Sequence, residues 1–360
     1  MQGLQKLWLL NIFSLPSTTR APVPWPYPQP TLSTMPIALP PALRPACLLL
    51  AAAALAGCAS APSTPAASAP AAPAELPLAA VLAKQIFQMT PQEAGRYIAH
   101  VHTAEPDLRK RIAAIGRKNL GQPYSLHLLG EFPYELHDNL PLYSLKESDC
   151  VVFAEHTYAM ALSQSWEEFF WMLQRIRYRD GVIGVATRNH YTEMDWNVAN
   201  RWLVTDVSAE LAGAGGPSYP MTVDRARFLR TRHNTVAEFP IESSRQAYVA
   251  KEQVAAVAAQ LQEGDFVNVI STRNGEYWAS HVGLVVLGPN GERHFLHSQE
   301  PKVREETFAS FMARAAEREA RNAAAGKPGQ VLAGFKFLRL NEQVTVPPMA
   351  PQPRPGRPGA

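Results

Sequence analysis

The spacing of hydrophobic residues changes near residue 264, and this change limits the folds that the chain can adopt. Before that point, apolar residues recur at helical spacing. After it, they alternate with polar residues or form short apolar runs, as in segments 265–271, 277–288 and 292–299. The first part therefore predicts helices, and the second part predicts strands.

Turn signals separate the predicted strands. Asn274-Gly275 is typical of a tight β-hairpin, and residues 289–291 (Pro-Asn-Gly) join the next two strands. A last strand is expected over 334–340. Helices followed by a run of antiparallel strands predict an α+β fold, with the N-terminal helices packed on an antiparallel sheet.

Helix boundaries can be placed from capping residues. Thr90 precedes Pro91 and forms a capping box with Glu93, which predicts a helix over 89–102. Gly121 then ends a second helix. Further helices are expected over 150–162, 165–178, 251–261 and 305–326. The exposed charged face of the last helix is interpreted as simply solvated.

Composition divides the chain into four parts. Residues 1–57 predict a leader with a lipoprotein signal peptide, 58–75 an Ala/Pro/Ser tether, 76–345 the folded domain, and 346–360 a disordered tail. Within the domain, residues 182–250 show little regular period. We expect them to form an insertion of loops and short strands between the helix predicted over 150–162 and the predicted sheet.

The leader contains an apolar run over 46–57, too short to span a bilayer well but suited to a signal-peptide core. It ends in Leu-Ala-Gly before Cys58, which resembles the bacterial lipobox whose cysteine is lipidated. A buried apolar helix ending at Gly57 is the alternative. Met35 would start a signal peptide of conventional length, and Ala59 would favour the outer membrane in a Gram-negative lipoprotein. We therefore expect a lipid-anchored cell-envelope protein that faces the periplasm.

Charge and histidine spacing argue against two classes of partner. The net charge is +3 with no dense basic stripe, so nucleic-acid binding is not expected. His294 and His297 are three residues apart on a predicted strand and point to opposite faces. No second cysteine or paired carboxylate completes a zinc site. We predict neither a metal nor a cofactor.

Cys150 is the single cysteine of the predicted domain, because Cys47 and Cys58 precede it. In an oxidising compartment it cannot form an internal disulfide. It could pack like a small apolar residue. Alternatively, a helix N-terminus and a nearby imidazolium would lower its pKa and make it a nucleophile.

A cysteine nucleophile needs a base, and the base needs a polar group to orient it. His281 opens an apolar strand, with Gly283 leaving room on the same face, and His297 lies on the next strand. A three- or five-residue turn centred on Pro289 would place the two histidines directly opposite each other, with Cβ atoms roughly 4.5–5.5 Å apart. A four-residue turn would break that register.

The order of these segments resembles the NlpC-type cell-wall cysteine hydrolases, which have a papain-like fold. The closer resemblance is to their N-acetylmuramoyl-L-alanine amidase-like branch. It is carried by segments 111–124, 149–162, 176–196 and 280–286 and covers most of residues 85–340. The resemblance implies that the chain hydrolyses an amide of peptidoglycan.

The resemblance also implies roles for single residues. Cys150 corresponds to the nucleophile, His281 to the general base, and His297 to the polar group that orients the base. The chain departs from the branch at Val151-Val152, where a threonine is common, and in Ser-Gln instead of Ala-Ser after His297. These departures concern the pocket and leave Cys150, His281 and His297 in their roles.

Two further groups are candidate substrate-binding residues. The resemblance implies that the segment with Asn189, His190, Tyr191 and Asp195 lines the substrate groove. A loop held by its own hydrogen bonds is the alternative. Tyr124 would shape the site, as a tyrosine upstream of the nucleophile does in the wider superfamily, or would be a core aromatic.

Three functions remain open at this point. The first is an amidase that cuts the bond between N-acetylmuramic acid and L-alanine in peptidoglycan or muropeptides. The second is a stem-peptide endopeptidase with the same three residues. The third is a non-catalytic wall-binding lipoprotein, which would usually have lost Cys150 or His281.

Overall fold

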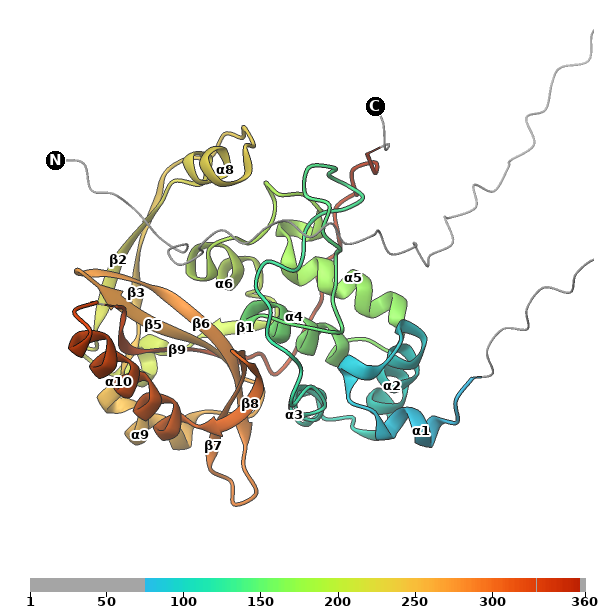
Figure 1. The fold of residues 1–360 in the computed structure, drawn as a ribbon, viewed down its shortest axis with the longest axis horizontal. Coiled ribbons are helices and arrows are strands. Elements are labelled where there is room, and N and C mark those ends of the chain that lie inside the picture. The colour runs from blue at the N-terminus through green and yellow to red at the C-terminus, as the bar shows by residue number, and fades with distance from the viewer. Residues whose placement is uncertain (1–74, 328, 357–360) are drawn as a thin grey trace, which may run out of the picture. The chain divides into compact units, whose positions relative to one another are not determined.

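The structure is a computed structural model that describes residues 75–327 and 329–356 (Figure 1). The predicted signal peptide, Cys58 and nearly all of the tether lie outside the described residues. In the part of the chain that the structure describes, no helix combines the length and apolar character needed to cross a bilayer.

The first layer is helical. Thr90 accepts a hydrogen bond from the Glu93 backbone N–H, so the predicted capping box is present. Asp149 and Ser165 cap two later helices in the same way. The helices are α1 (Leu78–Ala83), α2 (Pro91–Ala104), α3 (Leu108–Arg117), α4 (Cys150–Ala161) and α5 (Trp166–Arg177).

The second layer is an antiparallel sheet of seven strands within the described residues. Its order is β1-β9-β5-β6-β7-β8, and β4 also pairs with β9. The strands are β1 (Val204–Asp206), β4 (Val249–Ala250), β5 (Phe266–Arg273), β6 (Glu276–Leu287), β7 (Arg293–Gln299), β8 (Lys302–Thr307) and β9 (Val331–Leu340).

Both faces of this sheet are covered, as Figure 1 shows. On one face, Phe153 of α4 shares a buried core with Leu284 and Leu296 of β6 and β7. On the other, α9 (Val254–Val257) and α10 (Phe308–Ala324) cover the sheet, and Phe311 packs with Phe295. The predicted α+β fold with helices packed on an antiparallel sheet is confirmed.

The segment 182–250 is more regular than predicted. A π-helical turn (Thr192–Trp196) precedes α6 (Asn197–Ala199), and α7 (Ser208–Ala212) and α8 (Arg225–His233) follow. The strands β2 (Ser218–Val223) and β3 (Glu242–Ala247) form a separate two-stranded sheet. Because β1 and β4 join the main sheet, the segment also extends the domain core.

Two predicted helices need correction. The helix predicted over 305–326 begins at Phe308, because Thr307 is its N-cap and accepts from the Ser310 backbone N–H at 3.0 Å. Glu305 and Glu306 therefore belong to strand β8, which the sequence analysis missed. The helix predicted over 251–261 is α-helical only in α9 and has 3₁₀ turns on either side.

The end of the chain is held on the domain. Residues 346–356 have no regular secondary structure, unlike the strands before them. The Ala350 N–H donates to the Asp180 carbonyl at 3.0 Å, and the Gln352 amide donates to the Gly181 carbonyl at 2.7 Å. The described part of the predicted tail is thus bound to the loop after α5.

Candidate active site

Cys150 is the first residue of α4, as the sequence predicts. Asp149 caps the helix by accepting a hydrogen bond from the Val152 N–H at 2.8 Å. The Cys150 side chain is buried, and it is the free cysteine of the described residues. Burial and, to a smaller extent, the Asp149 carboxylate raise the pKa of the Cys150 thiol to about 12. The expected lowering of this pKa is therefore wrong for the resting site, because burial outweighs the helix N-terminus.

The thiol lies where the β6–β7 ladder opens. The ladder ends at the pair Leu284–Leu296, so Val282 and Ser298 are not paired with each other. The Val282 backbone N–H instead lies near the Cys150 sulfur, where it lowers the pKa of the thiol and partly offsets burial. Since Val282 directly follows His281, Cys150 lies beside the strand that carries the candidate base.

Serine hydroxyls fix the backbone just before the nucleophile. The Ser298 hydroxyl donates to the Ser148 carbonyl at 2.9 Å. The Ser148 hydroxyl donates to the Gln122 side-chain oxygen at 2.7 Å. These bonds tie the segment that enters α4 to the end of β7. Sequence reasoning identified neither serine, because each contact joins residues far apart in the chain.

His281 and His297 contact each other directly. His281 Nε2 lies 2.8 Å from His297 Nδ1, and both rings are buried. The predicted register is wrong, however, because β6 and β7 pair about Asn290 instead of Pro289. His297 Cβ therefore faces Gly283, and the two histidines are diagonal neighbours on one face. The missing side chain at Gly283 provides the room that the longer diagonal needs.

His297 is held on its far side by a carboxylate. His297 Nε2 lies 2.8 Å from Glu306 Oε1 on β8. The Arg314 guanidinium of α10 pairs with the same carboxylate, with Nε 3.0 Å from Oε2. A continuous hydrogen-bonded chain therefore runs from His281 through His297 and Glu306 to Arg314.

Burial sets the charge state of both histidines. It lowers the pKa of His281 well below its ordinary value, and His297 and the arginines of β8 and α10 (Arg304, Arg314, Arg318) lower it further. Burial also lowers the pKa of His297, and the bond to Glu306 opposes that change. At neutral pH both imidazoles are therefore neutral, and His281 can accept a proton.

The sequence of this region matches a known family. A model of the N-acetylmuramoyl-L-alanine amidase-like family matches residues 114–317. The chain belongs to this family. The matched span contains Cys150, His281, His297 and Glu306. Membership in the amidase-like family supports a cell-wall amidase acting on peptidoglycan-type material, in general terms. A search of curated proteins finds no match.

Several solved structures align with this chain at low sequence identity. A protein of Legionella pneumophila aligns with a TM-score of 0.54 and 19% identity, covering 71% of this chain and 96% of that one. This likeness shows the fold. An N-acetylmuramoyl-L-alanine amidase of Bacteroides uniformis aligns with a TM-score of 0.49 and 21% identity, covering 65% and 99%. A putative xylanase of Bacteroides fragilis aligns at 0.45 and 21%, covering 62% and 98%.

Tyr124 lies near Cys150. Its backbone bridges to Ser148, and its N–H donates to the Pro301 carbonyl at 3.0 Å. Burial raises the pKa of Tyr124, and a charge on Cys150 would raise it further. The side chain is only partly buried. Its proximity to the thiol is consistent with the predicted part in shaping the site, and substrate contact stays a prediction.

The segment 189–195 is held by one internal hydrogen bond and by contacts with the surrounding chain. The Asn189 amide donates to the Ile176 carbonyl at 3.0 Å, and the Tyr191 N–H donates to Asp195 at 3.0 Å. His190 contacts the Val185 carbonyl through Nε2 at 2.7 Å. Asp195 forms a buried ion pair with Arg225 of α8, with 2.6 Å between Nε and Oδ1. These contacts are structural, and the groove-lining role of the four residues stays a prediction.

The next residue along this segment supports the nucleophile helix. Trp196 Nε1 donates to Glu155 of α4 at 3.1 Å, and Arg177 donates to the same carboxylate at 3.3 Å. Burial raises the pKa of Glu155 to about 7, while the charge of Arg177 opposes that change. The family-like segment 176–196 therefore packs directly against α4 through buried polar contacts.

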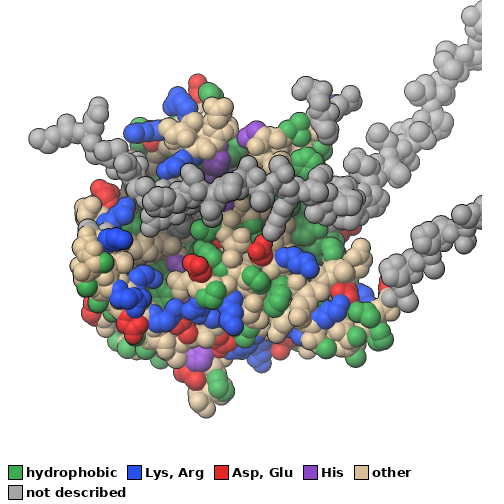
Figure 2. Space-filling model, in the orientation of Figure 1, with side chains coloured by type: hydrophobic (Ala, Val, Ile, Leu, Met, Phe, Trp, Pro, Cys, Tyr) green, Lys and Arg blue, Asp and Glu red, His purple; other side chains and the backbone are tan. Residues whose placement is uncertain are grey.

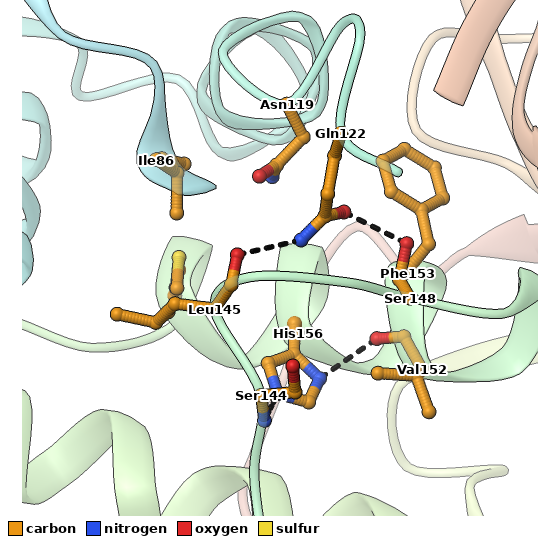
Figure 3. A pocket seen from close by; sticks show the side chains of 10 residues that line it. Ile86, Asn119, Gln122, Ser144, Leu145, Ser148, Val152, Phe153 and His156 are labelled. Carbon is orange, nitrogen blue, oxygen red and sulfur yellow. Dashed lines mark hydrogen bonds between the residues drawn. The ribbon is translucent and has the colours of Figure 1, made fainter. Parts of the chain in front are cut away.

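Figure 3 shows a small cavity behind the nucleophile helix. Its volume is about 10 Å³, so it has room for about one water molecule and none for a sugar or peptide. His156 lines it, with Nδ1 2.7 Å from the Val152 carbonyl, and burial lowers the pKa of His156 to about 3. This neutral histidine belongs to α4 and bonds to the helix turn before it.

No metal centre is formed by the residues that the structure describes, because no group of three or more His, Cys, Asp or Glu side chains could hold an ion. His294 bonds to Glu305 and not to His297.

Proposed function

We propose that this chain is a cysteine-dependent N-acetylmuramoyl-L-alanine amidase with a papain-like, NlpC-type arrangement. The observation that carries the proposal is that the Cys150 sulfur lies near the backbone N–H of Val282, the residue that follows His281 on β6. His281 in turn bonds to His297 at 2.8 Å. A thiol at a helix start, a base and an orienting group are the three parts that nucleophilic catalysis requires.

The resting charge states leave a proton on the thiol and a free lone pair on the imidazole, so the proton must move as the sulfur attacks and not before. The resting thiol and the resting imidazole are both neutral, since burial raises the pKa of Cys150 and lowers the pKa of His281. As the sulfur attacks the lactyl carbonyl of N-acetylmuramic acid, its proton passes to His281. The Cys150 backbone N–H at the start of α4 would stabilise the developing oxyanion.

Breakdown of the intermediate completes the reaction. Protonated His281 gives its proton to the nitrogen of L-alanine, the C–N bond breaks, and a thioester remains on Cys150. Water then hydrolyses the thioester. The products are a sugar with a free lactyl carboxylate and a peptide with a free L-alanine amine.

The test compares the wild-type protein with Cys150→Ala on a defined muropeptide, with products identified by mass spectrometry. We expect the wild type to release a free L-alanine amine and an intact sugar. The variant should lose turnover while its thermal melt stays close to that of the wild type. Turnover by the variant would exclude the mechanism, and cuts inside the stem peptide would favour the endopeptidase.

We also propose that the chain is a lipoprotein anchored through Cys58, which lies outside the described residues. The support is the Leu-Ala-Gly-Cys sequence directly after the apolar run. In cell fractionation, the wild-type chain should be found with membranes, and Cys58→Ser should not. Membrane association of the variant would contradict this proposal without affecting the catalytic one.

A further inference from the structure

Glu306 lies where it can control the proton positions of the catalytic histidines. On β8, Arg304 is directly opposite His297, and Glu306 is the next residue on the same face. Glu306 Oε1 lies 2.8 Å from His297 Nε2. Although burial raises the pKa of Glu306, the bonds from His297 and Arg314 lower it more, so this carboxylate is ionised at neutral pH.

The ionised carboxylate then determines which ring nitrogen of each histidine carries the proton. An ionised carboxylate can only accept, so His297 must donate from Nε2. In a neutral imidazole the other nitrogen carries a lone pair, so His297 Nδ1 accepts from His281 Nε2, 2.8 Å away. His281 is left with its lone pair on Nδ1. That nitrogen is free of His297 and is the one that can take the thiol proton.

We propose that Glu306, oriented by Arg314, is a positioning residue that sets the tautomers of His297 and His281. The role rests on the proposed cysteine mechanism and adds a fourth member to the three residues found by resemblance. Arg314 binds both carboxylate oxygens, which fixes the plane in which Glu306 meets His297. Glu306 also compensates the positive charge that His281 acquires during attack.

The charges around the two histidines make this compensation necessary. Three arginines of β8 and α10 (Arg304, Arg314 and Arg318) disfavour a proton on His281. Figure 2 shows Lys and Arg side chains gathered over this part of the molecule. From α4, Asp149 raises the pKa of the thiol. Glu306 acts in the opposite direction to the arginines, since its bond to His297 raises the pKa of that residue.

The chain offers a matched control in the next residue. Glu305 lies on the other face of β8 and bonds to His294 at 2.8 Å and to Arg117. Glu305→Gln therefore removes the same charge and another histidine–carboxylate bond away from the triad. Glu306→Gln keeps the shape of the side chain, but its amide can either donate to or accept from His297, so the proton order is no longer enforced.

The experiment measures the pH profile of kcat/KM on the muropeptide and the rate of Cys150 alkylation by iodoacetamide. Glu306→Gln should lower the plateau of kcat/KM by on the order of 10-fold to 10²-fold, no more than the loss of a general base. Its acidic limb should move to lower pH by about 1 unit, because loss of the carboxylate lowers the pKa of the histidine pair. Alkylation should also slow. Glu305→Gln should change none of these quantities.

Three outcomes would overturn the proposal. One is a Glu306→Gln protein with the wild-type plateau and acidic limb. Another is a Glu306→Gln protein whose kcat/KM plateau and melting temperature are both lower, but whose acidic limb stays at the wild-type pH. That result would make Glu306 a structural link between β8 and α10. The third is an equal response of Glu305→Gln. Alkylation needs no substrate, so it tests Glu306 even if the muropeptide proves to be the wrong substrate.

Discussion

Strands β7 and β8 carry two histidine–glutamate pairs, one on each face. His297 bonds to Glu306 and His294 bonds to Glu305, each with 2.8 Å between nitrogen and oxygen. In both pairs the glutamate lies diagonally across the ladder from the histidine. The His297 side chain is 0% exposed and its second nitrogen meets His281, whereas the His294 side chain is 17% exposed and its second nitrogen meets Glu292. The same local bond therefore serves different purposes, depending on the group beyond the histidine.

An arginine completes each pair, and each comes from a different layer. Arg314 of α10 holds Glu306, and Arg117 of α3 holds Glu305 with Nε 2.8 Å from Oε2. The pairs thus tie β8 to the helices on its two sides. Only the pair on the α10 side is continuous with His281 on β6.

The largest difference in kcat/KM between the two faces of β7 and β8 is expected when the histidines are replaced. His297→Ala should lower kcat/KM on the muropeptide by roughly 10-fold to 10²-fold, because the base loses the group that orients it. Replacing His281 itself should cost more, on the order of 10²–10⁴-fold. His294→Ala should leave kcat/KM near the wild-type value. A larger loss from His297→Ala than from His281→Ala would reverse the two roles.

A smaller effect is expected from glycine substitutions on β6 and just after it. A Cβ at Gly283 would lie 2.7 Å from His297 Cβ and 2.6 Å from the Phe295 ring, so Gly283→Ala must displace the orienting histidine. We expect a loss of about 1–3 kcal/mol in unfolding free energy and a lower kcat/KM.

Gly288→Ala is the control for this substitution. Its Cβ would meet the Glu292 side chain and the His294 ring on the other face at 2.6 and 2.8 Å. Glu292 is a flexible, largely exposed side chain that can move aside. Urea denaturation gives the unfolding free energy of each variant, and steady-state kinetics gives its kcat/KM. Equal losses of activity from both substitutions would show that the diagonal contact between His281 and His297 is not required.

The smallest effect is expected from the arginines. Arg314→Gln should lower kcat/KM a few-fold, because the Glu306 carboxylate would keep its charge but would no longer be held in one orientation. Arg117→Gln should leave kcat/KM unchanged and reduce the unfolding free energy by up to about 1 kcal/mol, because its ion pair is partly exposed. If Arg117→Gln reduces kcat/KM as much as Arg314→Gln, the two faces are coupled through β8.

Residues with a local signature could be predicted from the sequence. Cys150 follows a capping aspartate, His281 begins the apolar run within strand β6, and the helix over 89–102 has a capping box, so local spacing was sufficient for each. Glu306 has no such signature. It adjoins a charged helix, and a solvated helical face was the simplest interpretation of that segment.

The sequence by itself determined the order of helices and strands, the lone thiol at a helix start and the two histidines on successive strands, because these depend on spacing within short segments. The tertiary structure decided what the segments do together. It moved the centre of the β6–β7 hairpin from Pro289 to Asn290, which made the histidines diagonal neighbours, and it placed Glu306 and Arg314 behind them. It also buried the thiol, so that its pKa is raised instead of lowered. The physical reason is that cross-strand register and desolvation depend on residues far apart in the chain, which no local pattern records.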